Sequence, residues 1–83
     1  MNKIKNCLIV GASGGIGTEI TKKISELNYN LFLVGQNKKK LVKLKEEILE
    51  KNAVIKIEIE TVDLTNDQSI KNVIKKIRKK FGI

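Results

Sequence analysis

Four glycines fall within residues 11–17, immediately after the uninterrupted apolar run of residues 7–10. An amphipathic segment follows them, so the glycines stand where a strand would pass into a helix. An anion placed at such a junction meets the backbone N–H groups that the first helical turn leaves unpaired, together with the positive end of the helix dipole. That contact needs no cationic side chain. The spacing therefore predicts a phosphate-binding turn.

Each of the four glycines has its own expected role in this turn. Gly11 permits a tight exit from the strand, and Gly17 allows the helix to lie close to the sheet. Gly14 and Gly15 let the backbone come close to a ligand. The spacing matches G-x-x-x-G-x-G as well as G-x-x-G-x-x-G, and it does not match a P-loop because no Gly-Lys-Ser/Thr follows. A tight turn without a ligand is the alternative, but the strand and helix expected on its two sides favour nucleotide binding.

The length of 83 residues allows one small unit, whose core is marginal unless something else covers its apolar surface. The longest apolar run is too short to span a bilayer and residues 1–6 lack a signal-peptide core, so a cytoplasmic, non-membrane protein is expected. The single cysteine, Cys7, has no partner for an internal disulfide. Without histidine, the usual imidazole base and the commonest metal ligand are missing, and no metal site is expected.

A formal charge of +8 is compatible with nucleic-acid binding, because lysine patches displace counterions from phosphate. All but one of the 17 basic residues are lysines, however, and they are spread over the polar faces of the expected helices. The chain has only three aromatic residues, so stacking platforms for bases are missing. Solvated helix faces account for the charge better, and nucleic acid is not expected as a partner.

Apolar periodicity predicts three strands and three helices in strict alternation. They are expected at residues 5–10, 15–27, 31–34, 38–51 and 54–62, with a last helix that opens at a capping box of Thr65 and Gln68 and ends at residue 81. The strand at residues 54–62 alternates apolar and charged positions, which is typical of a sheet edge with one wet face. The first helix carries an apolar stripe that is expected to be its buried face and consists of Ile16, Ile20, Ile24 and Leu27.

The βαβαβα order predicts an α/β fold with a three-stranded parallel sheet in the order 3-2-1. This is the mononucleotide-binding half of a Rossmann-like fold, with the glycine turn at the ligand crevice. The third helix is expected on the opposite face from the other two, because the connection to it reverses direction. The third strand forms one edge of the sheet. The first strand forms the other edge and is left unpaired, although residues 7–10 are apolar on both faces.

Three further segments make the chain resemble the N-terminal third of a short-chain dehydrogenase/reductase, namely Val34-Gly-Gln-Asn-Lys38, Val62-Asp-Leu-Thr65 and the closing Phe81-Gly-Ile83. With the turn at residues 11–17 they occur in family order and cover nearly the whole chain. The resemblance implies that residues 1–83 are the N-terminal part of a single NAD(P)-binding Rossmann domain, truncated before the fourth strand and the catalytic region.

The resemblance also implies roles for individual residues. The cofactor pyrophosphate and adenosine ribose would be held by the first turn, at Gly11, Ser13, Gly15, Ile16 and Gly17, to which the backbone-approach argument adds Gly14. Asp63 and Leu64 would contact adenine, with Asp63 accepting a hydrogen bond from the exocyclic amine. The alternative for Asp63 is a loop carboxylate that helps to start the third helix.

The turn after the second strand, with Gln36, Asn37 and Lys38, is where the family chooses between NAD and NADP. An acidic residue at the end of that strand would accept bonds from a free ribose 2′-hydroxyl and repel a 2′-phosphate. Gly35 stands there instead, and Ser13, Asn37 and Lys38 could donate to a phosphate. Many NADP-using relatives have Arg in place of Gln36, so that bidentate clamp is missing. NADP(H) is expected rather than NAD(H), with a plain surface lysine as the alternative for Lys38.

The resemblance implies an oxidoreductase that exchanges hydride between nicotinamide and a carbonyl or alcohol group. The Tyr-x-x-x-Lys pair and the Ser that perform this chemistry belong to a part of the family fold beyond these 83 residues, and Tyr29 is followed by Leu33 four positions on. No catalytic residue is expected, so the chain alone should be inactive. The alternative is a small non-catalytic nucleotide-binding or interaction module. Expected partners are the dinucleotide and either a second copy of the chain or the remainder of the domain.

Overall fold

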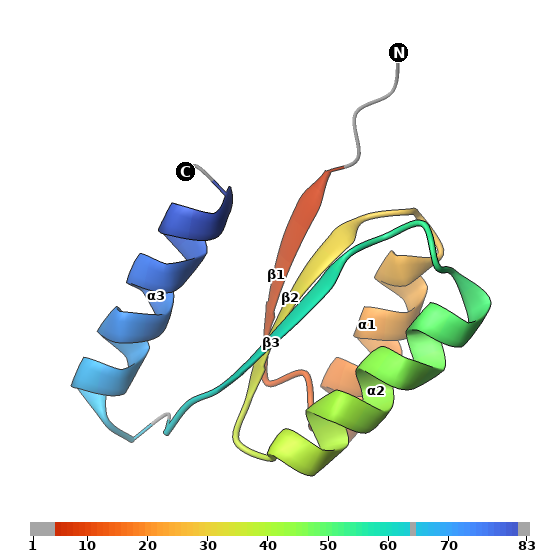
Figure 1. The fold of residues 1–83 in the computed structure, drawn as a ribbon. Coiled ribbons are helices and arrows are strands. Elements are labelled where there is room, and N and C mark those ends of the chain that lie inside the picture. Colours follow the sequence, from red (N-terminus) through yellow and green to blue (C-terminus); the bar gives the residue numbers. More distant parts are fainter. Residues whose placement is uncertain (1–4, 64, 82–83) are drawn as a thin grey trace.

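The computed structural model describes residues 5–63 and 65–81, in which strands and helices alternate as expected (Figure 1). The elements are β1 (Asn6–Val10), α1 (Gly15–Ser25), β2 (Asn30–Gly35), α2 (Lys38–Lys51), β3 (Ile57–Thr61) and α3 (Asp67–Phe81). The largest differences from the sequence-based boundaries are a later start of β3 and an earlier end of α1. After α1 the chain turns at Asn28, whose φ of 60° takes the backbone into the left-handed region.

The three strands are parallel and lie in the order β1-β2-β3, which confirms the predicted 3-2-1 arrangement. Leu31 of β2 lies opposite Cys7 of β1 and Ile57 of β3. All residues of β2 after its first are buried, and the side chains of Leu31 and Phe32 lie on opposite faces of the sheet. The central strand is therefore apolar on both sides, as a parallel sheet covered by helices requires.

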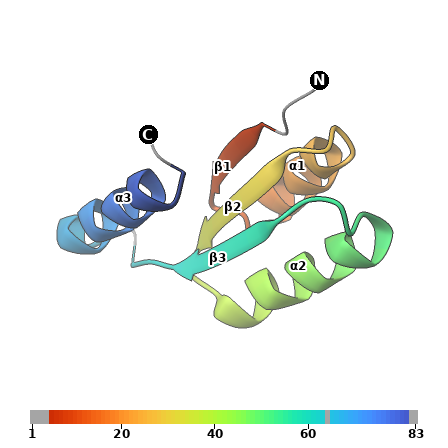
Figure 2. The ribbon, with the colours of Figure 1, turned by 45° about the horizontal axis from the view of Figure 1, so that its top comes forward.

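Helices cover both faces of the sheet (Figure 2). On one face α1 and α2 lie side by side, and the core beneath them is built from the larger apolar cluster, Ile9, Ala12, Leu31, Leu33, Leu41, Leu44, Ile48, Ile55 and Ile57. On the other face α3 lies alone over a smaller cluster made of Phe32, Val34, Val62, Val73 and Ile77. The expected crossing of the third helix to the opposite face is confirmed. Because the three strands are parallel, their carboxyl ends lie at one common edge of the sheet.

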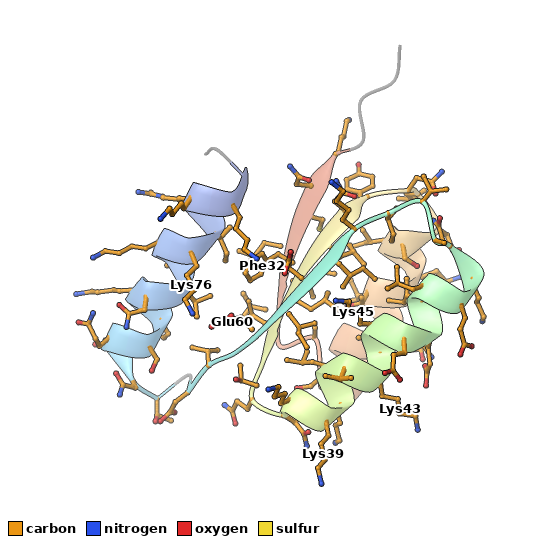
Figure 3. The ribbon with its side chains drawn as sticks, in the orientation of Figure 1. Phe32, Lys39, Lys43, Lys45, Glu60 and Lys76 are labelled. Atoms are coloured by element: carbon orange, nitrogen blue, oxygen red, sulfur yellow. The ribbon has the colours of Figure 1, made fainter. Side chains whose placement is uncertain are left out.

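The charged face of β3 turns toward α3 and remains partly exposed to water. Lys76 of α3 donates to Glu60 at 2.7 Å, and Lys80 lies 3.1 Å from Glu58. Figure 3 shows Glu60 and Lys76 directed toward one another from the two elements. All four side chains are at least partly exposed, so each pair is worth about 0–1 kcal/mol. The charged positions of β3 thus lie on one side of an edge strand, where they form ion pairs with α3.

The expected buried stripe of α1 is wrong except at Ile24, which is partly buried and packs against the larger apolar cluster. Ile16 is 81% exposed and Ile20 is 47% exposed, whereas Thr21 and Ser25 are buried. The buried positions follow Gly17 at intervals of four residues, so the face toward the sheet begins at the glycine that permits the closest approach. The hydroxyl of Thr21 donates to the Gly17 carbonyl at 2.7 Å, which satisfies it inside the helix.

The exposed isoleucines of α1 are turned toward the free edge of the sheet. On the opposite side of α1, Lys22 lies 3.7 Å from Glu47 of α2, so Ile16 and Ile20 point away from α2. The helix packs against β1, whose far edge has no neighbouring strand among the described residues. Val10 at the end of β1 is 58% exposed. Its pairing with Val34 places it on the α3 face of the sheet, so the edge strand and α1 expose apolar side chains on opposite faces.

Within the part of the chain that the structure describes, no helix is long and apolar enough to cross a membrane.

Candidate functional site

The glycine turn is tied to the neighbouring strand by one carbonyl oxygen. The N–H groups of Gly11 and Ala12 both donate to the Val34 carbonyl of β2, at 2.8 and 3.1 Å. Gly11 has a φ of +79°, in the region that favours glycine. The Gly14 N–H then donates back to the Gly11 carbonyl at 3.1 Å. The turn is thus a compact structure at the carboxyl edge of the sheet, where ligands bind in open α/β folds.

Gly17 is required by packing inside the turn. A Cβ atom added there would overlap the Gly11 carbonyl oxygen and would lie 2.9 Å from its carbon and 3.1 Å from Ala12 Cα. Because these neighbours are all backbone atoms, they cannot move aside as a side chain could. The expected role of Gly17 in close packing agrees with this geometry, although the contact is with the turn itself.

Gly14 and Gly15 are not required by the fold. A Cβ atom on Gly15 would meet nothing within 4 Å, and one on Gly14 would make only an ordinary 3.5 Å contact with the Gly11 carbonyl. Neither residue has a positive φ. The first bond of α1 runs from the Thr18 N–H to the Gly14 carbonyl at 2.8 Å, so the N–H groups just before it, including that of Ile16, precede the helical bonding pattern. The helix therefore opens with backbone donors that lie before its bonding pattern, next to two residues that carry no side chain.

The end of β2 brings a second set of predicted residues to this edge. Asn37 is the N-cap of α2, and its Oδ1 accepts from the Lys40 N–H at 3.1 Å. This leaves the amide nitrogen of Asn37 as its donor to a ligand. The first turn of α2 contains no acidic residue and begins with three lysines, of which Lys38 is the first. Cations at a helix N-terminus oppose the dipole by about 0.3–1 kcal/mol each, a cost that a bound anion would remove.

A recess of about 400 Å³ lies between the ends of β2 and β3, lined by Gln36, Thr61, Val62, Asp63 and Ser69. Gln36 and Asp63, both predicted as site residues, therefore come together. Sequence reasoning missed Ser69, which lies in the first turn of α3. The only signal for it in the sequence is its position near the start of that helix. The predicted residue Leu64 lies outside the described residues.

Asp63 organises the turn that leads into α3. Its Oδ1 accepts from the Thr65 hydroxyl at 2.6 Å and from the Thr65 N–H at 2.9 Å. The predicted capping box of Thr65 and Gln68 is wrong, because the threonine hydroxyl is engaged by Asp63. Asn66 caps the helix instead, its Oδ1 accepting from the Gln68 and Ser69 N–H groups at 2.9 and 3.3 Å. The loop role considered for Asp63 is thus present in the structure.

The hydrogen bonds from Thr65, that of its hydroxyl first and that of its N–H second, hold the pKa of Asp63 below its ordinary value. This stabilisation is complete above the pKa of the unfolded chain and is lost as the pH falls through the lower folded value.

We expect NMR titration of the Asp63 carboxyl to show a raised pKa in Thr65→Val, which lacks the hydroxyl donor. Thr65→Ser, which keeps it, should titrate like the wild type. Equal pKa values in all three chains would contradict the hydrogen-bond assignment.

A larger recess, of about 670 Å³, lies at the opposite end of the molecule, between the C-terminal halves of α1 and α2. Charged side chains of both signs line it, among them Lys22 and Glu47, which face one another across it. It lies at the amino ends of the strands, away from the glycine turn. The smaller recess is the better ligand site, because it adjoins the carboxyl edge.

Across residues 5–63 and 65–81, His, Cys, Asp and Glu side chains form no group of three that could hold a metal ion.

The chain is similar to known oxidoreductases. Residues 5–83 match the family model described as short chain dehydrogenase. The 3-oxoacyl-(acyl-carrier-protein) reductase FabG of Rickettsia typhi is 40% identical over 73 residues, which are 88% of this chain and 28% of that protein.

Solved structures show the same fold. The NADPH-dependent reductase YwfH, involved in bacilysin biosynthesis, has a TM-score of 0.90 at 24% identity, covering 96% of this chain and 32% of that one. A short-chain dehydrogenase from Sphingobium yanoikuyae in complex with NADPH has a TM-score of 0.82 at 27% identity, covering 90% and 29%. The chain thus spans less than a third of the length of these three proteins.

Proposed function

The chain belongs to the short-chain dehydrogenase family, and on this premise we propose that residues 1–83 are the N-terminal part of a dinucleotide-binding domain that takes NADP(H). The complete protein would exchange hydride between this cofactor and a carbonyl or alcohol group. The cofactor supplies or accepts the hydride, and the residues of this chain bind and orient it.

One observation carries the proposal more than any other. Gly15 stands in the first turn of α1 although neither its backbone angles nor the packing require glycine there, whereas Gly14 is the N-cap, a position that favours glycine over alanine. Glycine is entropically expensive, by roughly 0.5–1 kcal/mol relative to alanine in a helix. A diphosphate seated against the bare N–H groups of α1 explains the absence of side chains, because a Cβ atom would stand in its way.

A preference for NADP(H) is supported by the end of β2 and the start of α2. Gly35 offers no carboxylate to repel a 2′-phosphate, and Lys38, Asn37 and the N-terminus of α2 offer donors and positive charge. Two of the similar solved proteins are described as NADPH-dependent or as an NADPH complex. Adenine would lie in the recess beside Asp63, whose carboxylate could accept from the exocyclic amine while it also holds the turn.

Isothermal titration of the 83-residue chain tests the proposal. We expect NADPH to bind more tightly than NADH, and Lys38→Gln to weaken NADPH binding by about tenfold while leaving NADH unchanged, because charge-assisted bonds contribute about 1.5–3 kcal/mol. Lys43→Gln is the matched control, since Lys43 projects from the outer side of α2 (Figure 3). Carbonyl-dependent NADPH oxidation is not expected from the chain alone. Tighter binding of NADH, or turnover by the purified chain, would contradict the proposal.

We also propose that the free edge of β1 is covered in the working protein by a further strand. Its occupant is either a second copy of the chain or the remainder of the domain, which the longer matching proteins possess. The supporting observations are that β1 has no neighbouring strand on this side among the described residues and that Val10 of β1 and Ile16 and Ile20 of α1 are exposed.

A further inference from the structure

Backbone hydrogen bonds orient the peptide groups of the glycine turn on either side of the one that joins Ala12 to Ser13. Before it, the Ala12 N–H donates to the Val34 carbonyl of β2 at 3.1 Å. After it, the Gly14 N–H donates to the Gly11 carbonyl, also at 3.1 Å. Within the part of the chain that the structure describes, the Ala12–Ser13 peptide group itself makes no bond to another backbone group. The backbone alone therefore does not set its orientation.

A side chain of α1 holds this peptide group instead. The Thr18 hydroxyl donates to the Ala12 carbonyl oxygen at 3.0 Å, in a bond that is partly buried. Ala12 is fully buried and Thr18 is half-buried. Loss of the hydroxyl would leave the carbonyl oxygen without this donor, which is costly away from water. Thr18 therefore opposes rotation of the Ala12–Ser13 peptide group.

The orientation of the Ala12 carbonyl decides where the Ser13 N–H points. The peptide group is planar and trans, so its C=O and N–H bonds point in opposite directions. With the oxygen turned toward Thr18, the N–H is turned away from that side chain, and it has no hydrogen-bond partner in residues 5–63 and 65–81. A half-turn of the group would put an oxygen where the donor stands. An oxygen there would repel a phosphate group.

We propose that Thr18 is a positioning residue for the bound dinucleotide, because it keeps the Ser13 N–H available as a donor to the phosphates; this inference rests on the proposed function. The N–H groups of Gly15 and Ile16 also lack partners among the described residues, so the Ser13 N–H adds to a set of backbone donors suited to an anion. Thr18 acts only through the Ala12–Ser13 peptide group. Since NADPH and NADH contain the same pyrophosphate, Thr18 supports the binding of both and does not choose between them.

Titration with NADPH and NADH tests the positioning role. Thr18→Val keeps the shape of the side chain but lacks the hydroxyl, and we expect it to bind each dinucleotide about three- to tenfold more weakly, by the same factor. Thr18→Ser keeps the hydroxyl and should bind like the wild type. Thr21→Val is the matched control, because the Thr21 hydroxyl lies in the same helix and donates to the Gly17 carbonyl. Its loss should lower the melting temperature and leave both affinities unchanged.

Three outcomes of the titrations would overturn the positioning role. They are wild-type affinity in Thr18→Val, a loss confined to one of the two dinucleotides, and an equal loss in Thr18→Ser. If Thr18→Val fails to fold, Thr18→Ala and Thr18→Ser make the same comparison, because these two variants differ only by the hydroxyl.

NMR spectra without ligand test the orientation of the peptide group by itself. The Ala12 carbonyl carbon and the Ser13 amide should shift together in Thr18→Val, return in Thr18→Ser and stay in place in Thr21→Val. Unchanged signals in Thr18→Val would contradict the inference even if binding were weaker. If the wild type binds neither dinucleotide, the proposed function fails and the positioning role with it. Equal binding by the wild type and Thr18→Val would remove the positioning role alone.

Discussion

A Gly17→Val variant is expected to lose its cooperative thermal transition. The new side chain would be driven into the backbone of Gly11 and Ala12, where atoms already lie within about 3 Å of its first carbon. Overpacking of this kind typically costs 1–3 kcal/mol and sometimes more, and backbone neighbours give way less than side chains do, so we expect at least about 3 kcal/mol here. A unit of 83 residues is marginal to begin with, so a loss of this size removes a large share of its stability.

Gly15→Ala is the matched control, two residues earlier in the same turn. No atom lies within 4 Å of the added carbon, and alanine favours helix by roughly 0.5–1 kcal/mol over glycine, so the melting temperature should stay equal or rise. NADPH affinity should nevertheless fall, because the methyl group stands where the phosphate would approach. Gly17→Ala should behave in the opposite way and melt lower. A Gly15→Ala chain that bound NADPH as tightly as wild type would remove the diphosphate from this turn.

Lysine at the free edge of β1 is expected to abolish self-association of the isolated chain. Wild-type protein should sediment faster as its concentration rises, because an uncharged edge strand offers unpaired backbone groups to another chain. Val10→Lys adds a charge that would have to be buried on association, while the side chain is already 58% exposed in the monomer. The variant should therefore remain monomeric with little change in stability.

Val54→Lys provides the control for this experiment. Val54 is 70% exposed and precedes β3, at the other side of the sheet from the β1 edge. The variant carries the same extra charge and should still associate. If wild-type chains sediment as monomers at every concentration and melt in one sharp transition, the exposed edge needs no partner and the 83 residues form a complete unit.

Sequence patterns predicted the sheet well because each strand carries its own local signal. The apolar β2 had to be central and the alternating β3 had to lie at an edge, and both are found there. The buried face of α1 could not be predicted in the same way. Its isoleucine stripe has the stronger apolar pattern, but the approach of Gly17 to the turn rotates Thr21 and Ser25 inward. A close contact between backbones leaves no mark on a hydrophobicity pattern.

The same distinction between local signals and long-range contacts applies to the site residues. The glycine spacing indicated which residues gather at the carboxyl edge, because strand–turn–helix order alone fixes their position. The bonds from Gly11 and Ala12 to the Val34 carbonyl depend on the approach of two elements that are separated by a helix in the chain, and the sequence gives no distance between them. The cap of α3 was misplaced by one residue for a local reason, since Asp63 and Asn66 compete with Thr65 for the same turn.

The carbonyl oxygen of Val34 accepts hydrogen bonds from both Gly11 and Ala12, so the glycine turn can take its final shape only after β2 has paired with β1. The turn takes its shape from a strand that the ribosome releases only after α1 has been made. A short peptide that copies the glycine-rich stretch would contain every predicted phosphate contact and would still lack the scaffold that orders them. We therefore expect the proposed site to form together with the long-range pairing of β1 and β2, and loosening of that pair to weaken all of its ligand contacts at once.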